Sequence, residues 1–263
     1  MQSRARQRWN GQLKIGVGLI VCVVAVFCVY RESQAIQAES QTEKESNLKG
    51  QALAELFHRW TFDEQKPKEP PSGFSSIQAG GGGVSTWDVR PDSNAPSSPN
   101  ILSATSSCQS TTCYRMLLVD DLQYEYPDIS VRMRAPDDAR SSSGGLIISA
   151  KGSDNFYAAI VNMNEKTVRI VRMVNGKETV LSQASISPKA VDWHSLRVQR
   201  DTIISKDVIE VFFDGLLMLS VRDQSLGTGQ VGLLAYGETT LLFDSLYAAP
   251  LFSQRPLSNP AAY

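Results

Sequence analysis

Two dipeptides, Asn175-Gly176 and Asp214-Gly215, restrict what this chain can fold into more than any other feature. Each follows an apolar stretch rich in β-branched or aromatic residues, 168–174 in the first case and 208–213 in the second. Two-residue turns of type I′ need positive φ angles at both central residues, which Asn-Gly and Asp-Gly adopt at little cost. The sequence therefore predicts two antiparallel β-hairpins.

Further strand-like segments surround these hairpins. Residues 129–134 alternate between apolar and polar, and residues 156–163 are apolar on both faces, as in a central strand. Strands at this spacing, separated by turns and without a sustained helical period, predict an all-β fold in which two antiparallel sheets pack face to face. Residues 64–100, by contrast, are rich in Pro, Gly and Ser and are expected to form loops.

The N-terminus has the pattern of a membrane-targeting helix. Four basic residues precede an uncharged, mostly apolar run of 16 residues at 15–30, and the first acidic residue follows at Glu32. As a helix this run is about 24 Å long, slightly short for a hydrocarbon core of about 30 Å. A basic flank before an apolar run is typical of a signal peptide or of an uncleaved anchor, and both remain open. We therefore expect the remainder to be exported to the periplasm or the extracellular space. If the run is not cleaved, residues 15–30 tether the protein to the membrane.

Composition and charge complete the outline. Residues 1–30 form the signal peptide or anchor, 31–57 a polar linker, 58–250 the β-domain and 251–263 a tail. The formal net charge is −1, with 26 basic and 27 acidic residues. Because no basic surplus is present to neutralise phosphates, we expect no nucleic-acid partner.

Export changes how the cysteines are interpreted. Cys22 and Cys28 fall in the apolar run, whereas Cys108 and Cys113 lie in a Ser/Thr-rich segment between strand-like stretches. In an oxidising compartment the latter two are candidates for a short-loop disulfide. A redox or zinc pair is the alternative, but no further Cys or His lies nearby in the sequence.

Several motifs together resemble a known superfamily. They are residues 87–102, residues 144–157, and a series formed by 193–198, 213–215, 229–233 and 243–246. In their order and spacing they resemble the concanavalin A-like lectin/glucanase superfamily, most closely its laminin-G-like domains called 3-keto-disaccharide hydrolase-like or family 16 glycosidase-like. The resemblance covers residues 58–250 and implies a jelly roll of two curved sheets with a concave face. It does not imply one activity, because this fold carries both binding modules and enzymes.

Catalytic motifs are missing from the sequence. Retaining glycosidases need two carboxylates about 5 Å apart, which family 16 enzymes supply from Glu-x-Asp-x-x-Glu, and that motif does not occur. With only His58 and His194 in the chain, a three-histidine zinc site is not possible within it. We expect no cofactor, although the pairs Asp120-Asp121 and Asp137-Asp138 could contribute to a calcium site.

The alternation of residues 156–162 suggests where a ligand would bind. If Tyr157 faces the core, then Phe156 and Asn162 face the other way, joined by Ile147 and Ser149 from the preceding strand. These four are the candidate ligand-binding residues. The leading hypothesis is a non-catalytic jelly-roll domain that binds carbohydrate or another cell-envelope ligand. The alternatives are a glycoside hydrolase of the 3-keto-disaccharide hydrolase-like type and a protein-interaction or structural domain.

Overall fold

The computed structural model describes residues 56–108, 113–188, 192–203 and 205–251. The apolar run 15–30, nearly all of the 31–57 linker and all but the first residue of the 251–263 tail lie outside these residues, so the predictions made for those segments stay predictions. Within the described ranges, no helix is long and apolar enough to cross a membrane.

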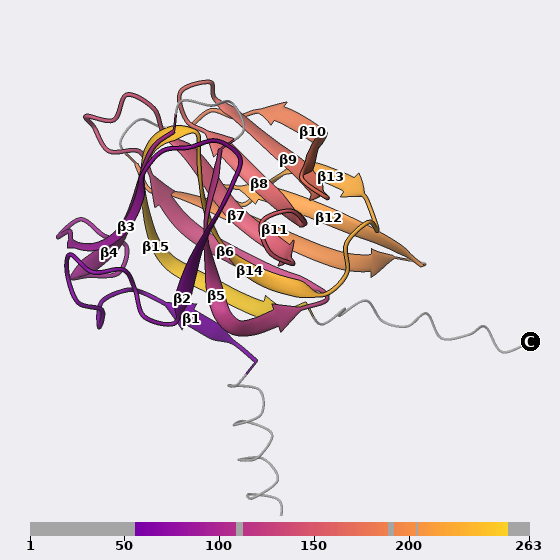
Figure 1. The fold of residues 1–263 in the computed structure, drawn as a ribbon, viewed down its shortest axis with the longest axis horizontal. Coiled ribbons are helices and arrows are strands. Elements are labelled where there is room, and N and C mark those ends of the chain that lie inside the picture. The colour runs from indigo at the N-terminus through magenta and orange to yellow at the C-terminus, as the bar shows by residue number, and fades with distance from the viewer. Residues whose placement is uncertain (1–55, 109–112, 189–191, 204, 252–263) are drawn as a thin grey trace, which may run out of the picture. The chain divides into compact units, whose positions relative to one another are not determined.

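The described chain folds into two sheets of antiparallel strands, which form the two layers of a sandwich (Figure 1). Sheet I has the order β13-β12-β11-β6-β15-β4-β3, with β1 pairing β15, and sheet II has the order β10-β9-β8-β7-β14-β5-β2. The strands are β1 (His58–Trp60), β2 (Phe74–Ala79), β3 (Ser85–Pro91), β4 (Asn100–Ser107), β5 (Tyr114–Tyr124), β6 (Pro127–Arg134), β7 (Ser143–Ala150), β8 (Phe156–Asn162), β9 (Thr167–Val174), β10 (Lys177–Ser185), β11 (His194–Ile203), β12 (Lys206–Phe213), β13 (Leu216–Arg222), β14 (Gly229–Tyr236) and β15 (Glu238–Pro250). The all-β, two-sheet antiparallel sandwich predicted from the sequence is confirmed.

Both predicted hairpins are present. Asn175 and Gly176 have φ angles of 50° and 72° between β9 and β10, and Asp214 and Gly215 have φ angles of 49° and 79° between β12 and β13. The outer strands of these hairpins, β10 in sheet II and β13 in sheet I, are edge strands in contact with each other, at the right of Figure 1. They close one side of the sandwich.

The expectation of loops over residues 64–100 is wrong in part, because β2 and β3 lie there. Strand β2 is an edge strand of sheet II whose serines are exposed, so it lacks the apolar alternation that marks a strand in a sequence. Strand β3 buries Trp87 and Val89 and ends at Pro91. Proline has no N–H to donate, and an edge strand such as β3 tolerates this because it has a neighbouring strand on one side alone. The glycines at 80–83 connect the two strands and carry the chain from one sheet to the other.

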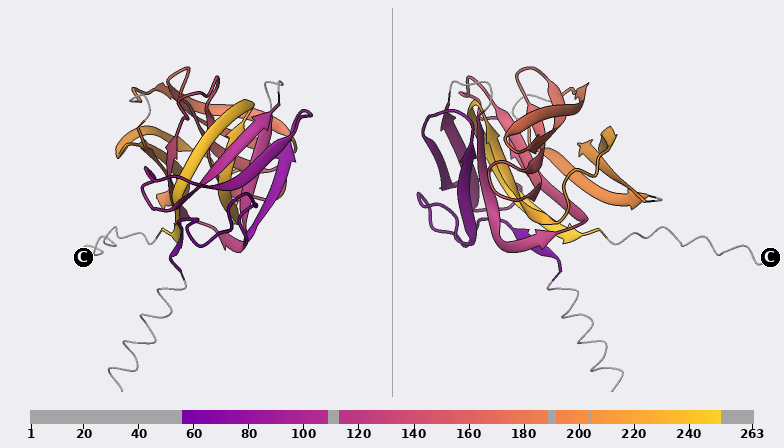
Figure 2. Two further views of the ribbon diagram at one scale, coloured as in Figure 1. Left: turned by 90° about the vertical axis from the view of Figure 1, so that its left-hand side faces the viewer. Right: turned by 45° about the vertical axis from the view of Figure 1, so that its right-hand side comes forward.

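The central strands of sheet II bury both of their faces. Tyr157, Ala159 and Val161 of β8 belong to the large core between the sheets. Phe156, Ala158 and Ile160, which alternate with them, belong to a second buried cluster on the other face of the sheet. This agrees with the sequence pattern, in which β8 is apolar on both faces. Figure 2 shows the curvature of the strands that form the two layers.

Arg200 of β11 ties the two sheets together inside the sandwich. Its side chain is 2% exposed, and Nη1 donates hydrogen bonds to Ser149 Oγ of β7 and to the Gly227 carbonyl, both at 2.9 Å. Nη2 donates to the Asp207 carboxylate and to the Leu226 carbonyl. Burial acts to raise the pKa of Asp207, but hydrogen bonds from Thr202 and Arg200 outweigh it, so the pKa lies below its ordinary value. The buried guanidinium is therefore held as an ion pair.

Arg200→Met should lower the free energy of unfolding by about 3–5 kcal/mol, because it leaves Asp207 buried without its partner. Urea unfolding measures this loss. Arg222→Met is the matched control: Arg222 is exposed on edge strand β13, and its replacement should change the free energy by less than about 0.5 kcal/mol. If Arg200→Met lowers the free energy of unfolding by less than about 1 kcal/mol, which is close to the effect expected of the control, the ion pair contributes little to stability.

Candidate functional site

Sheet II curls until two distant strands meet across its outer face. The Tyr114 hydroxyl of β5 donates a hydrogen bond of 2.5 Å to Glu178 Oε2 of β10, although these strands lie five places apart in the sheet. In a flat sheet, five strand spacings amount to about 24 Å. The outer face of sheet II is therefore concave. Burial and the Glu178 carboxylate raise the pKa of Tyr114, so its phenol stays protonated.

One part of this concave face is filled by its own side chains. The Tyr114 ring packs edge-on against Phe156 and against Tyr236, with centroid distances of 5.1 Å in both cases. The other members are aliphatic side chains or methionines, and all are buried. We call this group the concave-face cluster; it comprises Tyr114, Met116, Leu118, Ile147, Ala150, Phe156, Ala158, Ile160, Val171, Met173 and Leu234. Two candidate residues, Phe156 and Ile147, belong to it, and each is 0% exposed.

Ser149 lies elsewhere, and its expected place beside Phe156 is wrong. The pairing of β7 with β14 shifts register between Ile147 and Ala150, where β7 carries one extra residue, and Ser149 has a φ of 55°. This bulge breaks the alternation, so Ser149 Oγ accepts the hydrogen bond from Arg200 inside the sandwich. Ser149, which the sequence predicts to bind a ligand, thus also has a structural role as a hydrogen-bond acceptor for Arg200.

The fourth candidate, Asn162, lines a cleft at the open end of the concave face. The cleft has a volume of about 240 Å³. Its lining residues are Ser143, Ile160, Asn162, Glu165, Thr167, Arg169, Gln183 and Tyr236. Register explains why they meet: Asn162 pairs with both Ser143 and Thr167, and Arg169 pairs with both Ile160 and Gln183. Four adjacent strands, β7 to β10, thus supply two rows of side chains to one surface.

The polar groups of this cleft are positioned by local structure. Asn162 Oδ1 accepts the backbone N–H groups of Asn164 and Glu165, at 3.1 and 2.9 Å, so its amide nitrogen is the group left to donate. The Arg169 guanidinium lies over the Tyr236 ring, 4.6 Å from its centroid. Ser143 Oγ is buried and has no hydrogen-bond partner among the described residues. Hydrogen-bond donors therefore converge on the cleft, together with one carboxylate, that of Glu165.

Sheet I carries a second cleft, of about 630 Å³, around Trp193. The indole Nε1 donates to the Asn94 carbonyl at 3.1 Å, and Arg134 lies over the ring at 5.1 Å while pairing with Asp92 at 2.9 Å. The indole is therefore already engaged by the protein. Asp137 and Asp138, one of the two acidic pairs that could contribute to a calcium site, also line this cleft. In the part of the chain that the structure describes, no group of three or more His, Cys, Asp or Glu residues is placed to hold a metal ion.

His194 and two carboxylates, Asp214 and Asp244, make contacts that stabilise local structure. His194 Nδ1 lies 2.7 Å from Asp214 Oδ2, while Asp214 Oδ1 accepts the Ser195 N–H at 2.9 Å, so the hairpin turn is fixed to β11. Burial raises the pKa of Asp244, a fully buried residue whose two oxygens accept the N–H groups of Ser97 and Ser245. Neither carboxylate lines the concave cleft.

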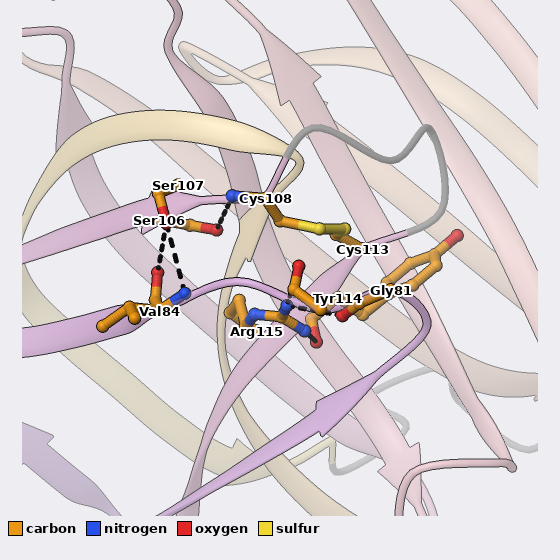
Figure 3. Close-up of a disulfide and its surroundings, with 9 residues drawn as sticks. Gly81, Val84, Ser106, Ser107, Cys108, Cys113, Tyr114 and Arg115 are labelled. Atoms are coloured by element: carbon orange, nitrogen blue, oxygen red, sulfur yellow. Dashed lines mark hydrogen bonds between the residues drawn. A yellow bond between two sulfur atoms is a disulfide. The ribbon is translucent and has the colours of Figure 1, made fainter.

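Cys108 and Cys113 form a disulfide that joins the end of β4 to the start of β5 (Figure 3). Residue Arg115, which is 0% exposed, lies close by, and its Nη2 donates to the carbonyls of Gly81 and Gly82 at 2.8 and 3.3 Å. The disulfide and this guanidinium hold the start of β5 and the glycine-rich connection. They thereby fix the strand that carries Tyr114.

Comparisons with solved structures identify the fold. A carbohydrate-binding module, CBM66 from Bacillus subtilis, matches with a TM-score of 0.52 and 16% sequence identity over 67% of this chain and 95% of its own. A cellulose-induced protein, Cip1, matches with a TM-score of 0.52 and 12% identity over 74% of this chain and 97% of its own. No protein-family model and no curated protein sequence matches the chain. These likenesses show the fold, a jelly-roll sandwich of two antiparallel sheets, which is the fold that the resemblance of the sequence motifs implies.

Tyr114→Phe should lower the free energy of unfolding by about 1–2 kcal/mol, because it removes a hydrogen bond to a carboxylate that closes the concave face. Chemical denaturation measures the loss. Tyr126→Phe is the control, since the Tyr126 hydroxyl makes only an exposed contact of 3.2 Å with Thr202, and it should change stability by less than about 0.5 kcal/mol. Equal effects of the two variants would contradict a special contribution of the Tyr114–Glu178 bond.

Proposed function

We propose that this chain is a non-catalytic carbohydrate-binding module whose ligand occupies the concave-face cleft. The observation that carries the proposal is the convergence of Asn162, Arg169, Gln183 and Ser143 on a preformed hollow. Sugars present many hydroxyl groups, and oriented donors on a fixed surface recognise them at small entropic cost. The carbohydrate-binding neighbour of the same fold supports this function.

The residues of this cleft support non-catalytic binding better than they support glycoside hydrolysis. Glycoside hydrolysis by the common mechanism needs a pair of carboxylates, about 5–5.5 Å apart in retaining enzymes and up to about 9.5 Å in inverting ones. Among the residues lining the cleft, Glu165 is the single acid. A hydrolase of the 3-keto-disaccharide hydrolase-like type would have to bring a second acid to this place.

A glycan array probed with the full chain in detergent tests the proposal, with product analysis of every sugar that binds. Asn162→Ala should weaken binding at least about tenfold, the cost of losing a buried polar contact of about 1.4 kcal/mol. The control is Gln199→Ala, on the outer face of sheet I. Cleavage of a bound sugar would favour the hydrolase, and loss of binding on calcium removal would reveal a metal requirement. If no glycan on the array binds, a protein partner is favoured instead.

The proposed location is outside the cytoplasm, with residues 15–30 as a signal peptide or tether. The disulfide between Cys108 and Cys113 supports an oxidising compartment. A module held at the membrane would place its cleft in the cell envelope, where carbohydrate polymers are accessible.

Fusing residues 1–57 to alkaline phosphatase, which is active only after export, tests this location in a bacterial host. We expect high phosphatase activity from the fusion and a large loss when charged residues replace Val23 and Val24 in the apolar run. The size of the fusion on a denaturing gel distinguishes cleavage from retention. A fusion without activity would overturn the proposal of export.

A further inference from the structure

Arg169 has no acidic partner in the concave-face cleft. Its side chain is half-buried, and in the described residues no carboxylate lies within ion-pair distance of it. Two other partly buried arginines of the domain form ion pairs: Arg134 with Asp92 at 2.9 Å and Arg172 with Asp223 at 2.6 Å. A partly buried guanidinium loses hydration that an anion would replace. Arg115 and Arg132 also lack a carboxylate, but each donates hydrogen bonds to a backbone carbonyl. Among the described residues, Arg169 has neither an ion pair nor a hydrogen bond, and it lines the cleft.

The guanidinium of Arg169 is also held in position before any ligand arrives. Tyr236 lies beneath it, at 4.6 Å from ring centroid to guanidinium carbon, in a cation–π contact. The Tyr236 ring is in turn packed by Tyr114, whose hydroxyl is fixed by Glu178. Stacking covers a face of the guanidinium and leaves its N–H groups, which lie in its plane, able to donate to a carboxylate in a bidentate manner.

A second, independent observation at the same place is Ser143. Its residue is 3% exposed, it lines the cleft, and its Oγ has no partner among the described residues. Buried hydroxyl groups are nearly always hydrogen-bonded, so an unsatisfied one that lines a cleft is available to a ligand hydroxyl. The register pairs Ser143 with Asn162, and Asn162 with Thr167, so this hydroxyl begins a polar row beside Arg169.

From these contacts we infer that the cleft binds an acidic saccharide, with the carboxylate of a uronic acid on Arg169 and ring hydroxyls on Ser143, Asn162 and Thr167. This inference rests on the proposed function and specifies its ligand. The volume of about 240 Å³ is below the roughly 300–1,000 Å³ of pockets for drug-sized ligands, which suits a single sugar ring. Glu165 is exposed at the cleft and accepts a hydroxyl there, which fixes the orientation of a ring that carries one negative charge.

Oligogalacturonates and the same oligomers with their carboxyl groups reduced to alcohols are the matched probes, titrated into the full chain by calorimetry. We expect the acidic oligomer to bind at least tenfold more tightly than the reduced one, and the preference to shrink as salt increases. Arg169→Gln should abolish the preference, so that the acidic and the reduced oligomer bind this variant with affinities within about twofold of each other. Arg169→Lys should retain part of it, because the charge remains but the bidentate fork is lost.

Arg222→Gln is the control for a general loss of positive charge, since Arg222 is exposed on β13 and outside the cleft, and it should leave both affinities unchanged. Equal affinity for acidic and reduced oligomers, or a preference that survives Arg169→Gln, overturns the inference. If a sulfated glycan binds through Arg169 while oligogalacturonate does not, the anion is not a carboxylate and the inference is also wrong. Binding of neutral sugars that depends on Asn162 but not on Arg169 refutes the acidic ligand and leaves the proposed function standing. No binding of any glycan removes both.

Discussion

The curvature of sheet II is the constraint on which the site depends. Strands β5 and β10 lie at widely separated positions in the sheet, yet Tyr114 and Glu178 are joined by a hydrogen bond across its concave face. Glycines allow close backbone contacts on the two adjacent strands β7 and β14 of this sheet. A Cβ at Gly144 would overlap the Leu234 carbonyl oxygen, and one at Gly232 would overlap the Leu117 carbonyl oxygen. Only strands without side chains at these points can approach so closely.

Curling divides the concave face into a closed part and an open part. Where the face closes, the rings of Tyr114 and Phe156 and their aliphatic neighbours exclude water and stabilise the sheet from its second side. In the other part, polar side chains of the paired strands β7 to β10 line a hollow. Tyr236 belongs to both parts, since its ring packs against Tyr114 on one side and under Arg169 on the other. Changes in the closed part should therefore be transmitted to the position of the guanidinium.

The sequence carried enough information for the fold because its strongest signals are local. Asn175-Gly176 and Asp214-Gly215 determine their turns because these residues readily adopt positive φ angles. Strand β8 has apolar residues on both of its faces, which indicates that both faces are buried. Strand β2 could not be predicted from the sequence, because an exposed edge strand has no hydrophobic period. Ser149 was misplaced because a bulge depends on the pairing of β7 with β14, which no pattern within β7 encodes.

The candidate site was predictable only in part, for the same physical reason. Alternation along β8 suffices to place Asn162 on the concave face. It does not tell whether Asn162 lies in the buried concave-face cluster or in the cleft, because that depends on the side chains of the neighbouring strands. Arg169 follows from alternation only after its register with Ile160 is known, because an arginine in an alternating strand is ordinarily a solvated surface residue. What distinguishes it is the lack of a carboxylate partner together with a ring beneath it, and both are relations between strands that are distant in sequence. The proposed site of this chain therefore depends on cross-strand register, which brings Arg169, without a carboxylate partner, into the same cleft as Asn162.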